Sequence, residues 1–263
     1  MNEATINRVI VHLSEFMQGM IRHRCEVEPF DERKVSTKNP FGAALVPMEI
    51  WKGSYFERSF VTKMGRGVFE RIAQIVAQGS GARTILQHST RARICTWRLE
   101  KIDQILAAQR TGNGAPDWNR EVSEILALNN DAYREVETIS DLFVERPDGT
   151  REFYCLKTVK PNLDQTEIAK RNMLYLTASD PRNQVFFGLP YNPAGEGKPY
   201  RDTGFTFPFS LFRMDDDPCV LIGGALWNRL GASDSVYDEL LAAFRHVGSQ
   251  FAREIRERYL GLH

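Results

Sequence analysis

The sequence lacks any cysteine arrangement typical of a disulfide framework or a zinc site. Its four cysteines, Cys25, Cys95, Cys155 and Cys219, lie far apart, with no CxxC motif and no histidine partner at zinc-site spacing. Free thiols in a reducing compartment fit this pattern better than disulfides or structural metal.

The sequence also lacks long apolar runs and an excess of either charge. No apolar stretch approaches the roughly 18 residues that a membrane-spanning helix needs, and the N-terminus has no secretory signal, so we expect a cytoplasmic protein. The 34 basic and 34 acidic residues balance, which gives no support to nonspecific coating of nucleic acid. A specific DNA enzyme with a local basic cleft is not excluded.

A predicted β-hairpin spans residues 140–162. Two strands, 141–145 and 151–158, flank an Asp-Gly pair, which is a strong hairpin signal between hydrophobic runs. Because strand side chains alternate between faces, Asp141 at the head of the first strand can reach the face that carries Lys157. The hairpin therefore predicts a carboxylate beside an ammonium, which is either a surface salt bridge or part of a cation-dependent site.

The aspartate, the hairpin and the Cys-Leu-Lys sequence together resemble the PD-(D/E)XK nuclease superfamily, and more narrowly its type II restriction endonucleases. In that family the first acid binds a metal ion, a second acid precedes a catalytic lysine by two residues, and the lysine acts on the attacking water. Asp141 and Lys157 match this pattern. Cys155 stands where the second acid is usual, and a thiol is a poor ligand for magnesium, so the resemblance implies another carboxylate.

A helix with several aliphatic residues follows Gly65 and Gly67 and resembles the first core helix of the same nucleases. The resemblance implies Glu70 as the additional acid. A solvated helix glutamate is the alternative for Glu70, and other carboxylates remain candidates for the metal site. They are Glu57, Glu137 and Glu167.

The resemblance implies an α/β restriction endonuclease-like fold with a mixed central sheet flanked by helices. We expect a single domain with an N-terminal helical arm over 1–38, a catalytic core over 39–232 and a C-terminal helix over 233–263. The implied enzyme is a homodimer that cleaves double-stranded DNA at a short (pseudo)palindromic sequence.

The implied cofactor is Mg²⁺, held by Asp141, the main-chain carbonyl of Leu156 and Glu70. Lys157 would orient or deprotonate the attacking water. Gln165 follows the lysine by eight residues, where related nucleases often place a polar residue near the water or the scissile phosphate.

DNA contacts are expected from polar residues outside the hairpin. Arg201 is the first candidate for reading a base, because arginine bound to guanine is the commonest specific contact. Lys160 and Lys170 are candidates for the phosphate backbone. The remaining candidates are Lys38, Asn39 and Lys198.

Hydrophobic periodicity predicts the other elements. The expected helices cover 4–22 and 91–110, a segment after an Asp117 cap, a segment from about 165, and the C-terminus from about 233. The expected strands cover 185–189 and 220–222, and the NPFGAALVP segment is expected to break regular structure.

Two other functions remain open from the sequence. One is a repair or recombination nuclease of the same fold that cuts by DNA structure. The other is a sequence-specific DNA-binding protein that has lost catalysis, which is suggested by Cys155 in place of the second acid.

Overall fold

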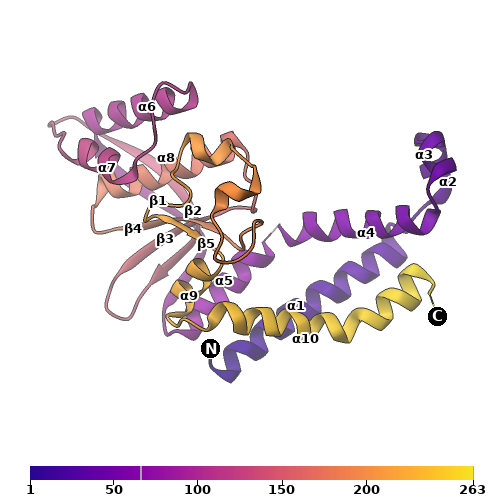
Figure 1. The fold of residues 1–263 in the computed structure, drawn as a ribbon. Coiled ribbons are helices and arrows are strands. Elements are labelled where there is room, and N and C mark those ends of the chain that lie inside the picture. Colours follow the sequence, from indigo (N-terminus) through magenta and orange to yellow (C-terminus); the bar gives the residue numbers. More distant parts are fainter. Residues whose placement is uncertain (66, 263) are drawn as a thin grey trace. The chain divides into compact units, whose positions relative to one another are not determined.

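The computed structural model describes residues 1–65 and 67–262. The chain divides into two compact units (Figure 1). The sheet unit comprises Ala73–Tyr237 with Met1, and the helical unit comprises Asn2–Ile72 and Asp238–His263. The expected single domain stays a prediction.

Within the described residues, five strands form one mixed sheet in the order β1-β2-β3-β4-β5. The first three strands pair antiparallel, and β3, β4 and β5 pair parallel. This confirms the expected α/β class with a mixed central sheet. The strands are β1 (Arg83–Cys95), β2 (Tyr133–Glu145), β3 (Arg151–Leu156), β4 (Gln184–Leu189) and β5 (Val220–Ile222).

The predicted hairpin is formed by β2 and β3. The Asp148 side chain accepts a hydrogen bond from Thr150 N at 2.9 Å, and Gly149 has a φ of 84°, a conformation that glycine adopts without steric cost. This turn aligns Leu142 with Tyr154. The turn chemistry in the sequence therefore sets the register of the two strands.

Helices cover the sheet unit's core on the side of α8 (Leu163–Ser179), which packs against β1 to β4. Helices α6 (Thr96–Arg110) and α7 (Trp118–Leu126) pack on α8 in turn. Their buried residues form one core cluster with Phe143, Phe153 and Phe187 of the sheet. Helix α9 (Gly224–Gly231) packs next to β5 (Figure 1).

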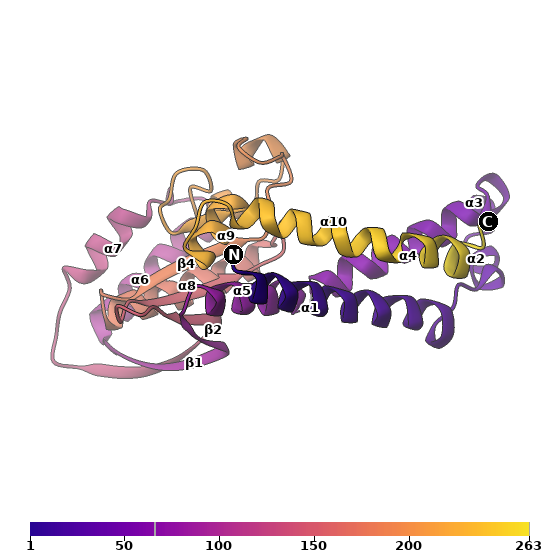
Figure 2. The same ribbon diagram turned by 90° about the horizontal axis from the view of Figure 1, so that it is seen from below.

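The helical unit is built from long helices joined by short ones (Figure 2). Phe16 packs on Phe60 with ring centroids 5.6 Å apart, and Phe56 packs on Tyr259 at 5.0 Å. The helices are α1 (Glu3–Arg22), α2 (Glu32–Lys38), α3 (Pro40–Leu45), α4 (Met48–Met64), the start of α5 (Val68–Gly79) and most of α10 (Val236–Glu254). π-Helical turns follow α1 (His23–Val27) and α10 (Ile255–Leu260). In the described part of the chain, no helix combines the length and apolar content needed to cross a bilayer.

Two local predictions were wrong. Residues 91–95 belong to β1 and not to a helix, because Arg91 and Arg93 are exposed while Ala92 and Ile94 are buried, which is the alternation of a strand. The NPFGAALVP segment contains α3: the Asn39 side chain accepts a hydrogen bond from Gly42 N, and proline follows at the first helical position. Both residues start a helix at this point.

Candidate active site

Asp141, inside β2, and Lys157, directly after β3, lie together as the sequence predicts, although β2 begins at Tyr133 and not at Asp141. Lys157 Nζ lies 2.8 Å from Asp141 Oδ2, and the two side chains are 22% and 20% exposed. The main chain of Lys157 is fixed by its N–H, which donates to Gly188 O of β4 at 3.0 Å. The ion pair therefore sits on a rigid sheet and remains open to solvent on one side.

A third polar side chain, Gln87 of β1, joins this pair. Gln87 Nε2 donates to Asp141 Oδ1 at 3.3 Å, so the two oxygens of the carboxylate each accept a hydrogen bond from a different residue. Sequence reasoning missed Gln87, because it assigned no strand to residues 83–90. A strand assignment alone would not have shown which residue of β1 faces Asp141.

The β1–β2 ladder is interrupted where Gln87 faces Asp141. Gln87 has a φ of 49°, the left-handed conformation, which costs an ordinary residue about 1–2 kcal/mol. Gln87 and Asp141 do not pair through their backbones, although β1 and β2 keep the same register on either side of them. The flanking pairs are Leu86↔Leu142 and His88↔Ser140.

The interruption shifts which side chains face the core. Val136 packs against the core cluster that contains Phe143, although the two residues are an odd number of positions apart on β2. Strict alternation would put them on opposite faces. The change of face therefore falls between Val136 and Phe143, a stretch of β2 that contains Asp141.

His88, which follows Gln87 in β1, belongs to a cluster of stacked rings. The His88 ring stacks on Phe143 with centroids 4.6 Å apart, and Phe143 packs on Phe153 at 4.9 Å. Burial lowers the pKa of His88 from its usual 6.5, and the positive charge of Arg83 lowers it further. The neutral imidazole is therefore favoured next to these rings.

Cys155 is buried in the core on the α8 side. Its side chain is 2% exposed, its Sγ is 3.9 Å from Ala169 O, and burial raises its pKa to about 12. The thiol is therefore protonated at neutral pH and brings no negative charge to the position of the usual second acid.

The other carboxylates differ in their surroundings. Glu167 forms ion pairs with Arg110 at 2.5 Å and Arg171 at 3.3 Å, and Glu137 accepts a hydrogen bond from Ser89 at 2.5 Å. Within residues 1–65 and 67–262, no three histidine, cysteine, aspartate or glutamate side chains converge as a metal site.

Glu70 and Glu57 lie in the helical unit. Glu70 is half-buried in the first turn of α5, and Glu57 is exposed on α4. Their expected part in a metal site stays a prediction.

The family is decided by comparison with known proteins. A model of the family described as "Type II restriction endonuclease, HinfI" matches residues 5–248. The chain belongs to this family. The type II restriction enzyme HgiBI of Herpetosiphon aurantiacus is 26% identical over 257 residues, which cover 94% of this chain and 92% of that enzyme. HgiEI of the same organism is 25% identical over 276 residues, which cover 98% of each chain.

Membership of the HinfI family confirms the resemblance to type II restriction endonucleases and the expectation of an endonuclease that cleaves DNA site-specifically. Enzymes of this class generally use divalent metal ions. Neither the repair nuclease nor the silent DNA-binding protein gains support from these relatives. Magnesium, a palindromic site and the homodimer stay predictions.

The remaining predicted site residues of this HinfI-family enzyme lie at element ends. Gln165 is exposed and forms a capping box with Asn162 at the start of α8, accepting from Asn162 N at 3.3 Å. Leu156 ends β3 and pairs with Gly188. Gln165 thus stabilises the helix start in this structure, and its predicted part near the water stays untested.

The predicted DNA contacts divide by unit. Lys38 ends α2 and Asn39 caps α3 in the helical unit. In the sheet unit, Lys160 and Lys198 are exposed in loops. Arg201 is also exposed, and its Nε donates to Asp215 Oδ2 at 2.8 Å, which engages one of the five N–H donors of the guanidinium.

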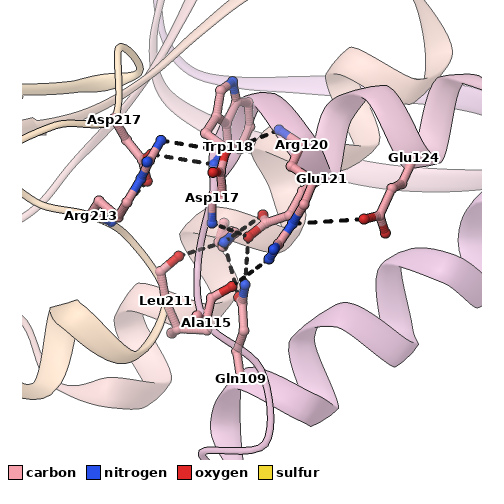
Figure 3. A network of polar contacts seen from close by, with 11 residues as sticks. Gln109, Ala115, Asp117, Trp118, Arg120, Glu121, Glu124, Leu211, Arg213 and Asp217 are labelled. Atoms are coloured by element: carbon pink, nitrogen blue, oxygen red, sulfur yellow. Dashed lines mark hydrogen bonds and ion pairs between the residues drawn. The ribbon is translucent and has the colours of Figure 1, made fainter.

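Lys170, a predicted phosphate contact, cannot serve that purpose. Its side chain has no exposed surface, and Nζ lies 2.6 Å from Glu121 Oε2 and donates to Gln109 Oε1 at 3.0 Å. Glu121 also accepts hydrogen bonds from Gln109 and from Asp117 N (Figure 3). Burial lowers the pKa of Lys170, and the ion pair with Glu121 opposes this effect.

The same network ties a loop to helix α7. Asp217 accepts hydrogen bonds from Trp118 N at 3.3 Å and from Arg213 Nε at 3.0 Å (Figure 3). Lys170 Nζ donates to Leu211 O at the other end of the same loop. The buried charges thus fix the loop that follows Arg201, and a lysine that reads as a surface residue is a structural one.

Proposed function

We propose that this enzyme hydrolyses phosphodiester bonds in double-stranded DNA at a short (pseudo)palindromic sequence, with Mg²⁺ as cofactor and a PD-(D/E)XK fold. The observation that carries the proposal is the ion pair of Asp141 and Lys157 at 2.8 Å, which joins strand β2 to the residue that follows the paired strand β3. It lies where the acid and lysine of that nuclease pattern are expected.

Asp141 fits a magnesium ligand. Magnesium prefers oxygen donors, keeps several waters and is commonly held by only one or two carboxylates together with substrate phosphates. Asp141 offers a carboxylate that is one-fifth exposed and held by donors on both oxygens, and the carbonyl of Leu156 would be a second oxygen donor. Bound there, the ion would supply charge neutralisation at the scissile phosphate and an acidified water.

Lys157 would act on the water and on the developing negative charge. Its ammonium has three N–H donors and Asp141 accepts from one of them, so two could bind a water or a phosphate oxygen. An attacking water held by Lys157 would meet the phosphate in a fixed direction, and positioning of this kind removes much of the entropic barrier.

The acid that completes the site is proposed to be Glu70. The alternative in the sheet unit, Glu167, is neutralised by Arg110 and Arg171, which makes it a poor ligand. We expect Glu70→Gln to abolish cleavage while sparing DNA binding, and Glu167→Gln to leave cleavage intact. If neither substitution affects cleavage, the assignment of the second acid is wrong.

The enzyme is proposed to act as a homodimer, because a two-fold protein matches a two-fold site and each subunit then cuts one strand. The pair of Asp141 and Lys157 would give each chain a centre that cuts one strand, and cleavage of both strands would then need two chains.

Digestion of unmethylated phage DNA tests the proposal. With Mg²⁺ we expect discrete fragments whose ends share one short symmetric sequence, and with EDTA no cleavage. A smear without common ends would contradict sequence-specific cleavage, and cleavage in EDTA would contradict the metal requirement.

A further inference from the structure

Asp141 is held from both sides by residues that come from two different strands. Lys157, after β3, donates to Oδ2 at 2.8 Å, and Gln87 of β1 donates to Oδ1 at 3.3 Å. A carboxylate oxygen has two lone pairs, so each oxygen of Asp141 keeps one with which it can bind a cation. The two donors together fix the plane of the carboxylate.

The backbone at Gln87 is arranged around this contact. Gln87 is one of only two non-glycine residues with positive φ in the described chain, and its φ of 49° falls at the step where the β1–β2 ladder is interrupted. Glycine and asparagine adopt this conformation at lower cost than glutamine. The strand nevertheless carries a side chain long enough to reach across the interruption to Asp141.

We propose that Gln87 is a positioning residue of the cleavage reaction, orienting the Asp141 carboxylate for the cation. This inference rests on the proposed function, in which Asp141 is a metal ligand. Hydrogen bonds from residues behind a metal ligand orient the ligand and tune its affinity, and their loss commonly costs about 10–100-fold in metal affinity or activity. Gln87 acts in this way through Asp141 and not by touching DNA.

Two substitutions separate the side chain of Gln87 from its backbone. Gln87→Gly removes the amide and suits a positive φ, so the fold should be retained. Gln87→Asn keeps an amide and tolerates the same φ, but its reach is one methylene shorter. We expect about 10–100-fold loss for Gln87→Gly and a smaller loss for Gln87→Asn.

Three readouts are required: the calorimetric affinity of the free protein for Mn²⁺, the single-turnover cleavage rate against Mg²⁺ concentration, and DNA affinity in EDTA. We expect weaker Mn²⁺ binding and a higher Mg²⁺ requirement for Gln87→Gly, with DNA affinity in EDTA unchanged. Unchanged metal binding and metal dependence, with only the melting temperature altered, would overturn the inference. An equal loss of DNA affinity in EDTA would also overturn it, because Gln87 would then be a DNA contact.

Asp141→Asn, measured in parallel, separates this inference from the proposed function. If Asp141→Asn cleaves like the wild type, the proposed active site at Asp141 fails and the inference with it. If Asp141→Asn is inactive and Gln87→Gly behaves like the wild type, only the role of Gln87 is wrong.

Discussion

Lys157 Nζ lies 2.8 Å from Asp141 Oδ2, and each side chain is about one-fifth exposed. The pair is therefore partly withdrawn from water, which strengthens its attraction, but it remains accessible from outside. A phosphate, a cation or a water can therefore reach the pair from the solvent.

Replacement of Lys157 tests whether its ammonium takes part in the reaction. Lys157→Met should lower the single-turnover cleavage rate by about 10²–10⁴-fold, the contribution typical of a positioned proton-transfer group. Lys157→Arg should not restore the rate, because a planar guanidinium cannot direct its donors as an ammonium does. Cleavage by Lys157→Met at the wild-type rate would leave the ion pair with a structural role only.

Arg201 and Lys198 should have different effects on DNA recognition. If Arg201 reads a base, Arg201→Ala should lower discrimination against other sequences by about 1–3 kcal/mol. Lys198→Ala should weaken target and non-target DNA alike and lower the salt dependence by roughly one charge. Anisotropy titrations on both DNAs at several salt concentrations measure these effects. Equal weakening on both DNAs by Arg201→Ala would assign it to the backbone.

His88 should contribute to the loss of stability in acid. Its folded-state pKa lies below 6.5, so below that pH the unfolded chain binds more protons and stability falls as pH decreases towards the folded pKa. Above pH 6.5 both states are neutral and the contribution is complete.

His88→Phe keeps a ring on Phe143 and removes this titration. Its melting temperature should fall less than that of the wild type between about pH 7.5 and about pH 5. The pKa of His12 is also lowered by burial, but His12 is present in both proteins, so the difference reports on His88. Identical pH dependence of the two proteins would show that His88 contributes nothing.

The buried pair of Lys170 and Glu121 should be sensitive to removal of one partner. Lys170→Met leaves the Glu121 carboxylate buried without its cation and should cost about 3–5 kcal/mol in urea unfolding. Adding Glu121→Gln removes the buried charge and should recover much of the loss, since coupled residues are not additive. A cost below about 1 kcal/mol for the single variant would contradict this account of the network.

The hairpin and its ion pair could be predicted because their determinants are local. An Asp-Gly turn and strand alternation fix the positions of Asp141 and Lys157, which are only 16 residues apart in the chain. Gln87 is 54 residues from Asp141, and its contact depends on the kink in β1, for which the sequence shows no pattern.

Lys170 shows a second limit of sequence reasoning. On a helix, a lysine reads as a solvated residue, and the partner that permits its burial comes from a different helix, α7. Residues 91–95 were assigned to a helix because their apolar residues also fit helical spacing with the genuine helix that follows. In the structure this segment pairs with β2 and is therefore a strand.

The measurement that tests the central claim most directly compares the wild type with Asp141→Asn in DNA binding and in Mg²⁺-dependent cleavage. Asparagine preserves the shape of the side chain and an oxygen facing Lys157, so the fold and DNA affinity in EDTA should remain. Loss of the carboxylate should raise the activation free energy of site-specific cleavage by several kcal/mol, which slows cleavage roughly 10³-fold or more. Unimpaired cleavage by Asp141→Asn would contradict the assignment of this ion pair as the active site.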